Sequence, residues 1–232
     1  MKKQYQHIFF DLDRTLWDFD RNSEITLEEI YRDYQLQSCF GSFLLFKSRF
    51  EYHNKKLWVA YYQDRIKKEV LVYRRFYLCL KEAGLDDLEL AKEIAQSFIE
   101  LSPLQTKTFP NTHETLAYLK EEGYQMHIIT NGFNEVQGKK LRNCGLNEFF
   151  THIITSEDAG HNKPHPEIFS MALSKSGAKL DESLMIGDDL KTDILGARQF
   201  GMDQVFFNPK QVKSDREELL EIQNLLELRE IL

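Results

Sequence analysis

The sequence is poor in the features that mark several broad classes of protein. Its three cysteines are scattered, so they form neither a disulfide framework nor a paired metal-binding pattern. The longest uninterrupted apolar run covers only residues 57–62, far short of the roughly 20 residues that a membrane-spanning helix needs. The N-terminus also lacks an apolar stretch long enough for a secretory signal. We therefore expect a cytoplasmic protein with no membrane partner.

Positive charge is also scarce. The chain has 30 lysines and arginines against 37 acidic residues, which gives a net charge of −7. Because proteins that bind nucleic acid need a basic surface to neutralise phosphates, we expect no nucleic-acid polymer as a partner. Neither a Walker A loop nor a GxGxxG loop occurs, so the use of ATP or a dinucleotide has no support. No feature of the sequence indicates an oligomeric state.

What the chain does contain is an alternation of two patterns. Five short apolar runs have the length of buried strands, at residues 7–10, 126–130, 152–155, 184–187 and 204–207. Segments with helical periodicity separate the later runs, at residues 112–122, 135–144, 166–176 and 190–200. This alternation predicts an α/β fold, a doubly wound parallel sheet with helices on both faces.

Several residues predict where helices begin and end. A glycine follows each of the four helical segments, as expected at a helix C-terminus, at Gly123, Gly145, Gly177 and Gly201. Asn111 and Glu114 have the spacing of a capping box at a helix start. Apolar residues at helical spacing across 215–231 predict a terminal helix packed on the core.

Residues 20–105 interrupt the alternation, because they show helical patterns and no convincing strand. The simplest interpretation is an inserted all-helical domain at 20–103, with residues 1–19 and 104–232 forming the α/β core. Residues 31–77 hold 13 of the 29 aromatic residues. These aromatics either form the core of the helical domain or supply one or two rings that stack on a flat ligand.

Polar residues gather where the predicted strands end. In an open parallel sheet these ends meet at one crevice, so residues far apart in sequence should converge there. Several carboxylates at one place repel one another unless a cation lies among them, and ligands that offer only oxygen favour a hard ion such as Mg²⁺. The expected group contains Asp11, Asp13, Thr15, Thr130, Asn131, Gly132, Lys163, Asp188, Asp189 and Asp193.

Four short segments of this group resemble a known family. The segment DLDRTL at 11–16 resembles the first motif, DxDxT, of the haloacid dehalogenase (HAD) superfamily. TNG at 130–132, KP at 163–164 and GDDLKTD at 187–193 resemble its other three motifs, in the same order. An insertion directly after the first motif is similar to that of members with a helical C1 cap. DRTLWDF at 13–19 is most similar to the YjjG-like pyrimidine 5′-nucleotidases, although Arg14 stands where many members have glycine.

The resemblance implies a role for each residue. Asp11 would attack phosphorus and become phosphorylated, and Asp13 would protonate the leaving oxygen and then activate water. Lys163 would balance charge on the nucleophile and the transferring group. The remaining implied roles are phosphate binding by Thr130 and Asn131, Mg²⁺ binding by Asp11, the Asp13 carbonyl and Asp188, and support of these ligands by Thr15, Asp189 and Asp193.

The function implied is a Mg²⁺-dependent phosphomonoesterase acting on a small phosphorylated metabolite, with a pyrimidine nucleoside 5′-monophosphate as a candidate. Asp13 favours phosphate-ester hydrolysis over dehalogenation, because an alkoxide leaving group needs a proton and a halide does not. Two enzymatic alternatives stay open, a sugar-phosphate phosphatase and a phosphomutase of the same superfamily. The alternative that is not an enzyme is a phospho-aspartate signalling domain.

Overall fold

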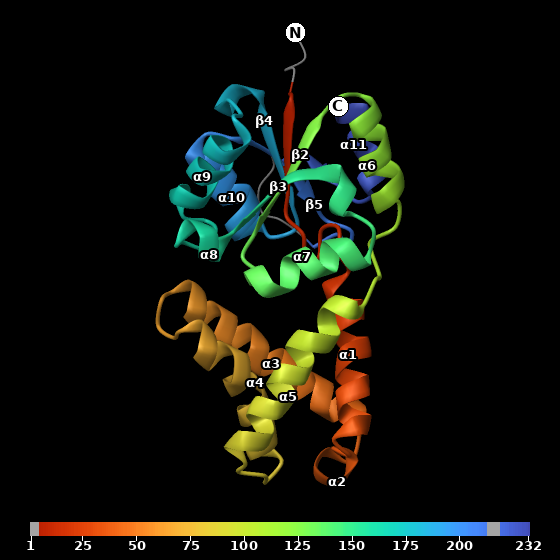
Figure 1. The fold of residues 1–232 in the computed structure, drawn as a ribbon, viewed down its shortest axis with the longest axis vertical. Coiled ribbons are helices and arrows are strands. Elements are labelled where there is room, and N and C mark those ends of the chain that lie inside the picture. The colour runs from red at the N-terminus through yellow and green to blue at the C-terminus, as the bar shows by residue number, and fades with distance from the viewer. Residues whose placement is uncertain (1–4, 213–218) are drawn as a thin grey trace. The chain divides into compact units, whose positions relative to one another are not determined.

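The computed structural model describes residues 5–212 and 219–232 (Figure 1). The chain divides into two compact units. One contains residues 1–19 and 106–232, and the other contains residues 20–105. Within the described residues, no helix is both long enough and apolar enough to cross a membrane.

A parallel sheet forms the centre of the first unit, in the order β3-β2-β1-β4-β5-β6. Its strands are β1 (His7–Phe10), β2 (Gln125–Thr130), β3 (Phe150–Thr155), β4 (Ser183–Gly187), β5 (Asp203–Phe207) and β6 (Glu221–Ile222). All five predicted strands are confirmed, and every pair is parallel. β1 lies between β2 and β4, so the chain continues from β1 to β2 on one side of β1 and later returns from β3 to β4 on the other side. The ends of β1 and β4 therefore border the crevice in which such sheets bind ligands.

Helices cover both faces of this sheet, as predicted (Figure 1). They are α6 (Thr112–Glu121), α7 (Asn134–Asn143), α8 (Ser156–Ala159), α9 (Pro166–Ser176), α10 (Leu195–Phe200) and α11 (Leu228–Ile231). Side chains alternate along β1: Ile8 and Phe10 join the core under α6, α7 and α11, whereas Phe9 joins the core under α9 and α10. A π-helical turn, Leu190–Ile194, precedes α10, so the segment predicted as one helix begins with a wider turn.

The second unit is helical throughout. Its helices are α1 (Phe19–Asp33), α2 (Gln37–Phe40), α3 (Phe43–Tyr62), α4 (Lys68–Glu82) and α5 (Leu88–Leu101). Most aromatics of residues 31–77 form or border its core, which is built around Phe40, Phe46, Phe50 and Phe76. Four aromatics lie outside that core: Tyr52 and, near the end of α3, Trp58, Tyr61 and Tyr62. Trp58 packs against Tyr61 and Tyr62 with ring centroids 5.7 and 5.4 Å apart.

The predicted helix ends are partly confirmed. Gly123, Gly145, Gly177 and Gly201 all have positive φ, between 67° and 91°, a backbone conformation that only glycine adopts without strain. The predicted capping box is wrong. Asn111 is itself left-handed, with φ of 66°, and its side chain makes no cap and donates to Asn224 instead. Glu114 pairs with Arg229, so both side chains bind the C-terminal segment, which a local pattern does not reveal.

The predicted terminal helix over 215–231 is also wrong where the structure describes it; residues 213–218 lie outside the described part. The backbone of β6 extends the sheet, with Phe206 N donating to Leu220 O and Asn208 N donating to Ile222 O, both at 2.8 Å. Only the last four residues before the C-terminal leucine form α11. The apolar residues of this segment do pack on the core, because Ile222, Leu225 and Leu228 are buried. These three residues belong to a strand, a 3₁₀ turn and a short helix, respectively, and not to one continuous helix.

A row of histidines crosses three strands of the sheet. His127 Nε2 lies 3.1 Å from His7 Nδ1, and His127 Nδ1 lies 2.8 Å from the Thr151 hydroxyl. The rings of His7 and His152 stack on either side of the His127 ring. Burial, followed by the charges of its two histidine neighbours, lowers the pKa of fully buried His127 to about 3. The native state therefore keeps this ring neutral across the pH range in which an unfolded histidine gains a proton.

This row predicts a loss of stability in acid. Between pH 6.5 and 3 the unfolded state binds a proton at His127 that the native state does not, so the free energy of unfolding falls as pH falls. The expected contribution is at most roughly 2 kcal/mol between pH 6.5 and pH 5. Urea unfolding at both pH values measures it. The His127→Gln variant should lose that part of the pH dependence, whereas variants of exposed His113 should keep it. An unchanged dependence in His127→Gln would contradict the assignment.

Candidate active site

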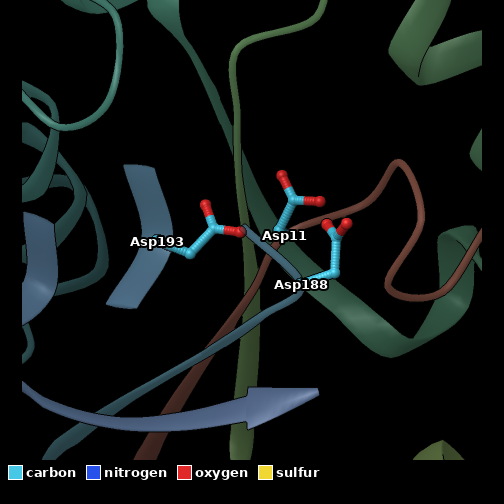
Figure 2. A group of neighbouring side chains, drawn as sticks. All are labelled: Asp11, Asp188 and Asp193. Atoms are coloured by element: carbon cyan, nitrogen blue, oxygen red, sulfur yellow. The ribbon is translucent and has the colours of Figure 1, made fainter. Parts of the chain in front are cut away.

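Three carboxylates converge at the carboxyl ends of β1 and β4 (Figure 2). Asp11 directly follows β1, Asp188 directly follows β4, and Asp193 lies in the π-helical turn. Each offers an oxygen atom, and these atoms all lie within 4.8 Å of one another. The close approach requires Gly187, because a Cβ there would lie 2.3 Å from Asp193 Oδ2.

Lys163 inserts its side chain among these acids. Its Nζ donates to Asp11 Oδ1 and to the backbone oxygen of Ile129, both at 2.7 Å, and lies 2.7 Å from Asp193 Oδ1. The side chain of Asn131 holds the lysine's backbone: Lys163 N donates to Asn131 Oδ1 at 2.7 Å, and Asn131 Nδ2 donates to Lys163 O at 3.1 Å. Residues that the sequence placed after four different strands therefore form one connected group.

The electrostatics of this group favour an added cation. Burial raises the pKa of Asp11 to about 7, against the opposing effect of Lys163. Burial, followed by the charges of Asp11 and Asp193, raises the pKa of Asp188 to about 9, and burial also raises the pKa of Asp193. Burial acts against the charge of Lys163, but its two carboxylate partners outweigh it and raise the pKa of its ammonium group. One ammonium thus faces three carboxylates, and a divalent cation would relieve their repulsion.

The donor set fits a hard ion such as Mg²⁺. The clustered side chains offer only oxygen, without histidine or cysteine. Asp193 already uses both of its oxygens, one with Lys163 and one accepting from Asp189 N at 3.0 Å. Asp11 and Asp188 are thus better placed as metal ligands than Asp193, which supports Lys163.

The other two residues expected to support the ligands differ in position. Thr15 is buried, and its hydroxyl lies 3.4 Å from Asp11 Oδ2 and 3.4 Å from Asp188 Oδ1, so it bridges these carboxylates. Asp189 is exposed, and its side chain caps the π-helical turn by accepting from Lys191 N and Thr192 N, both at 2.8 Å. Its backbone contacts the cluster through Asp193: Asp189 N donates to Asp193 Oδ2, and Asp189 O accepts from Asp193 N, both at 3.0 Å.

Arg14 lies at the edge of the site. It adopts φ of 70°, in the region that favours glycine, and its guanidinium stacks 4.4 Å from the centre of the Phe19 ring. Together with Asp188, Asn208 and Lys210 it lines a pocket of about 180 Å³ within the α/β unit. Its charge opposes the upward shift in the pKa of Asp188.

Asp13 stands apart from the acidic cluster, although it follows Asp11 by only two residues. Its Oδ2 accepts from Gln137 Nε2 at 2.8 Å, and its Oδ1 lies 2.5 Å from Lys140 Nζ. Gln137 Nε2 also donates to the Thr130 hydroxyl at 2.7 Å. The two carboxylates of the first motif therefore have different surroundings, one beside Lys163 and Asp188 and the other beside α7.

Sequence reasoning missed Gln137 and Lys140. Both are buried, although the polar composition of α7 predicts an exposed helix. A signal was present: α7 begins just after Thr130-Asn131-Gly132, and a spacing of three residues puts both side chains on one face of the helix. Gly132 is a further signal, because a Cβ there would lie 1.9 Å from Gln137 Nε2.

Comparison with known proteins gives one family. Residues 5–201 match the family model described as haloacid dehalogenase-like hydrolase. The chain is 29% identical to the HAD-hydrolase YfnB of Bacillus subtilis, with 99% of this chain and 96% of YfnB covered. A crystal structure of YfnB, described as bound to magnesium and as revealing interdomain movement, superposes with a TM-score of 0.89 at 27% identity, covering 99% of both chains.

Two further relatives have named activities. The pyrimidine 5′-nucleotidase YjjG of Escherichia coli is 30% identical, over 88% of this chain and 87% of its own length. The glyceraldehyde 3-phosphate phosphatase of Methanothermobacter thermautotrophicus is 35% identical, but over only 54% of this chain and 59% of its own length.

Proposed function

This chain belongs to the haloacid dehalogenase-like hydrolase family and is a phosphatase of that family; we propose that it hydrolyses a small phosphate monoester with Mg²⁺, through an aspartyl phosphate at Asp11. The observation that carries this proposal is that two neighbouring carboxylates, Asp11 and Asp13, have different surroundings. Asp11 lies against the ammonium of Lys163 and beside Asp188, as a nucleophile for phosphorus requires. Asp13 lies outside that cluster, where a proton can move to and from it.

The proposed reaction has two steps. An Asp11 oxygen attacks phosphorus, the bond from phosphorus to the leaving oxygen breaks, and Asp13 gives that oxygen its proton. A water molecule, deprotonated by Asp13, then attacks the phosphorus of the aspartyl phosphate and releases inorganic phosphate and free Asp11. Thr130 and Asn131 bind the phosphoryl oxygens, and the ammonium of Lys163 stabilises negative charge in both transition states.

We propose that Mg²⁺ binds to Asp11, to the backbone carbonyl of Asp13 and to Asp188, with Thr15, Asp189 and Asp193 supporting these groups. When bound, the ion neutralises charge on the phosphoryl oxygens and lets an anionic nucleophile approach an anionic substrate. The relative YfnB, whose structure is described as bound to magnesium, supports this assignment.

Removal of the metal gives a direct prediction. Excess EDTA should abolish phosphate release by the purified enzyme, and added Mg²⁺ should restore it. Because an ion that binds only the folded state stabilises it, Mg²⁺ should also raise the melting temperature, an effect that Asp188→Asn should remove. Full turnover in excess EDTA would contradict a role for the metal.

For the substrate, we propose a pyrimidine nucleoside 5′-monophosphate, with the helical unit at 20–103 acting as a substrate-selecting cap. Two observations support a nucleotide: the similarity to YjjG over most of both chains, and the rings of Trp58, Tyr61 and Tyr62 outside the helical core. The similarity to a glyceraldehyde 3-phosphate phosphatase favours a sugar phosphate instead, but it covers only about half of this chain. We also propose a cytoplasmic location, in keeping with the free thiols of Cys39, Cys79 and Cys144.

A phosphate-release screen with Mg²⁺ tests the substrate class. Stacking of a base on an aromatic side chain contributes ~1–3 kcal/mol, so uridine 5′-monophosphate should exceed glyceraldehyde 3-phosphate in kcat/KM by roughly 5- to 150-fold. Trp58→Ala should reduce that preference, whereas Tyr52→Ala, an exposed aromatic earlier in α3, should not. Equal or better turnover of sugar phosphates would overturn the nucleotide assignment. Transfer of phosphate between substrates without release of inorganic phosphate would identify a phosphomutase.

A further inference from the structure

The Asp13 carboxylate is held by two side chains of a single helix. Gln137 and Lys140 lie three residues apart on α7, and each contacts a different oxygen of the carboxylate. The side chain of Lys140 is only 4% exposed, against 22% for that of Asp13. The pair therefore differs from a surface salt bridge, in which two solvated chains contribute little. One side of the carboxylate faces the helix and the other remains open.

The surroundings of Lys140 fix its ammonium group in place. Besides its contact with Asp13, its Nζ lies 4.1 Å from the centre of the Trp17 ring. Trp17 is fully buried and belongs to the same loop as Asp13, which is closed by a hydrogen bond from Arg14 N to Trp17 O at 2.8 Å. The loop thus supplies both the carboxylate and the aromatic ring that the ammonium contacts. A buried lysine needs such partners, because desolvation of its charge is costly.

Gln137 links the acid to the proposed phosphate-binding residue. Its amide nitrogen donates both to Asp13 Oδ2 and to the Thr130 hydroxyl, at 2.8 and 2.7 Å, and its side chain is fully buried. A carboxylate has about four lone-pair positions, so two donors still leave positions from which Asp13 can exchange a proton. Because the two donors fix the plane of the Asp13 carboxylate, they determine which of its lone-pair positions stay available for proton exchange.

We propose that Gln137 and Lys140 are positioning residues that hold the Asp13 carboxylate in the orientation needed for proton transfer to the leaving oxygen. This inference rests on the function proposed above, in which Asp13 is the general acid and base. Proton transfer requires the donor within hydrogen-bond reach of the reacting oxygen and correctly aligned, so a freely rotating carboxylate would spend little time in a productive orientation. Lys140 acts through Asp13, whereas Gln137 contacts both Asp13 and Thr130.

The Lys140→Met variant tests this inference through its dependence on the leaving group. It keeps an unbranched side chain over Trp17 but removes the donor. For an alkyl ester such as uridine 5′-monophosphate, kcat/KM should fall by about 10- to 100-fold, part of the range typical of general acid–base catalysis. For para-nitrophenyl phosphate, whose leaving group needs little protonation, it should fall less than about 3-fold. Lys140→Arg should restore much of the loss, and Lys139→Met removes an exposed charge from the same helix as a control.

A double-mutant comparison separates positioning from simple structural support. In an Asp13→Asn background the acid is already lost, so Lys140→Met should cost nothing further with the alkyl ester. Equal losses for both leaving groups, or additive losses in the double variant, would overturn the inference. If Lys140→Met does not fold, as judged by thermal melting, Gln137→Met decides the question by the ratio of its losses with the two esters, because its lost contact with Thr130 affects both esters alike. Failure of the proposed function is distinct, because the unaltered enzyme would then release no phosphate.

Discussion

Replacing Asp11 with asparagine should reduce phosphate release by at least about 10⁴-fold, because the amide cannot attack phosphorus. The fold should survive. Burial and nearby acids already raise the pKa of Asp11 to about 7, so a neutral side chain there relieves repulsion, and Lys163 keeps its pairing with Asp193. A phosphate-release assay on the purified variant, with thermal melting alongside, measures both effects.

The matched control for this variant is Asp181→Asn. Asp181 is an exposed acid that precedes β4, at the opposite end of the strand from Asp188. The control makes the same chemical change away from the crevice, so its activity should equal that of the unaltered enzyme. An Asp11→Asn enzyme that retained more than a few per cent of the activity would exclude Asp11 as the nucleophile.

Replacing Asp13 with asparagine should have an effect that depends on the leaving group. The variant keeps the backbone carbonyl proposed to bind Mg²⁺, but it loses the proton that the leaving oxygen needs. For a nucleotide or sugar phosphate, kcat/KM should fall by about 10²- to 10⁴-fold. The loss should be much smaller with para-nitrophenyl phosphate, because kcat/KM reports only the steps up to cleavage of the ester bond and this leaving group departs without a proton.

In the proposed mechanism, the second half of the reaction needs Asp13 whatever the leaving group, because water must still lose a proton. The Asp13→Asn variant should therefore release a burst of about one para-nitrophenolate per active site and then turn over slowly. A rapid-mixing absorbance measurement detects this burst. Equal losses of kcat/KM for good and poor leaving groups would contradict the role of Asp13 as the acid.

The sequence predicted the scaffold of this site well. Strand runs in parallel sheets are buried on both faces, so they appear as continuous apolar segments, and each of the five predicted strands was found within two residues of its prediction. The rule that strand ends share one edge then brought together Asp11, Asn131, Lys163 and Asp188, which are up to 177 positions apart. The types of these residues and their positions after the predicted strands were enough to predict that they meet.

What the sequence did not predict depends on contacts between distant side chains. Gln137 and Lys140 belong to a polar helix that would normally face water. Contacts with Asp13, Trp17 and Thr130 from other segments explain their burial. Asn111 has the right spacing for a cap, yet the C-terminal segment competes for it through Asn224. In the same way, the apolar spacing after residue 218 fits a helix, but open backbone groups on β5 bind that segment as a strand. Local periodicity carries no information about such partners.

In the proposed mechanism Asp11 carries the phosphoryl group between the two steps, and acid quenching during the first turnover detects that intermediate. The Asp13→Asn variant is mixed with Mg²⁺ and para-nitrophenyl phosphate, quenched in acid within the burst, reduced with borohydride and digested for peptide mass spectrometry. Borohydride converts an aspartyl phosphate to homoserine, so the peptide that contains Asp11 should carry homoserine at that position, and the Asp11→Asn/Asp13→Asn variant should carry none. Phosphate on another side chain, or unmodified Asp11 in a sample that has released its burst of para-nitrophenolate, would contradict the mechanism.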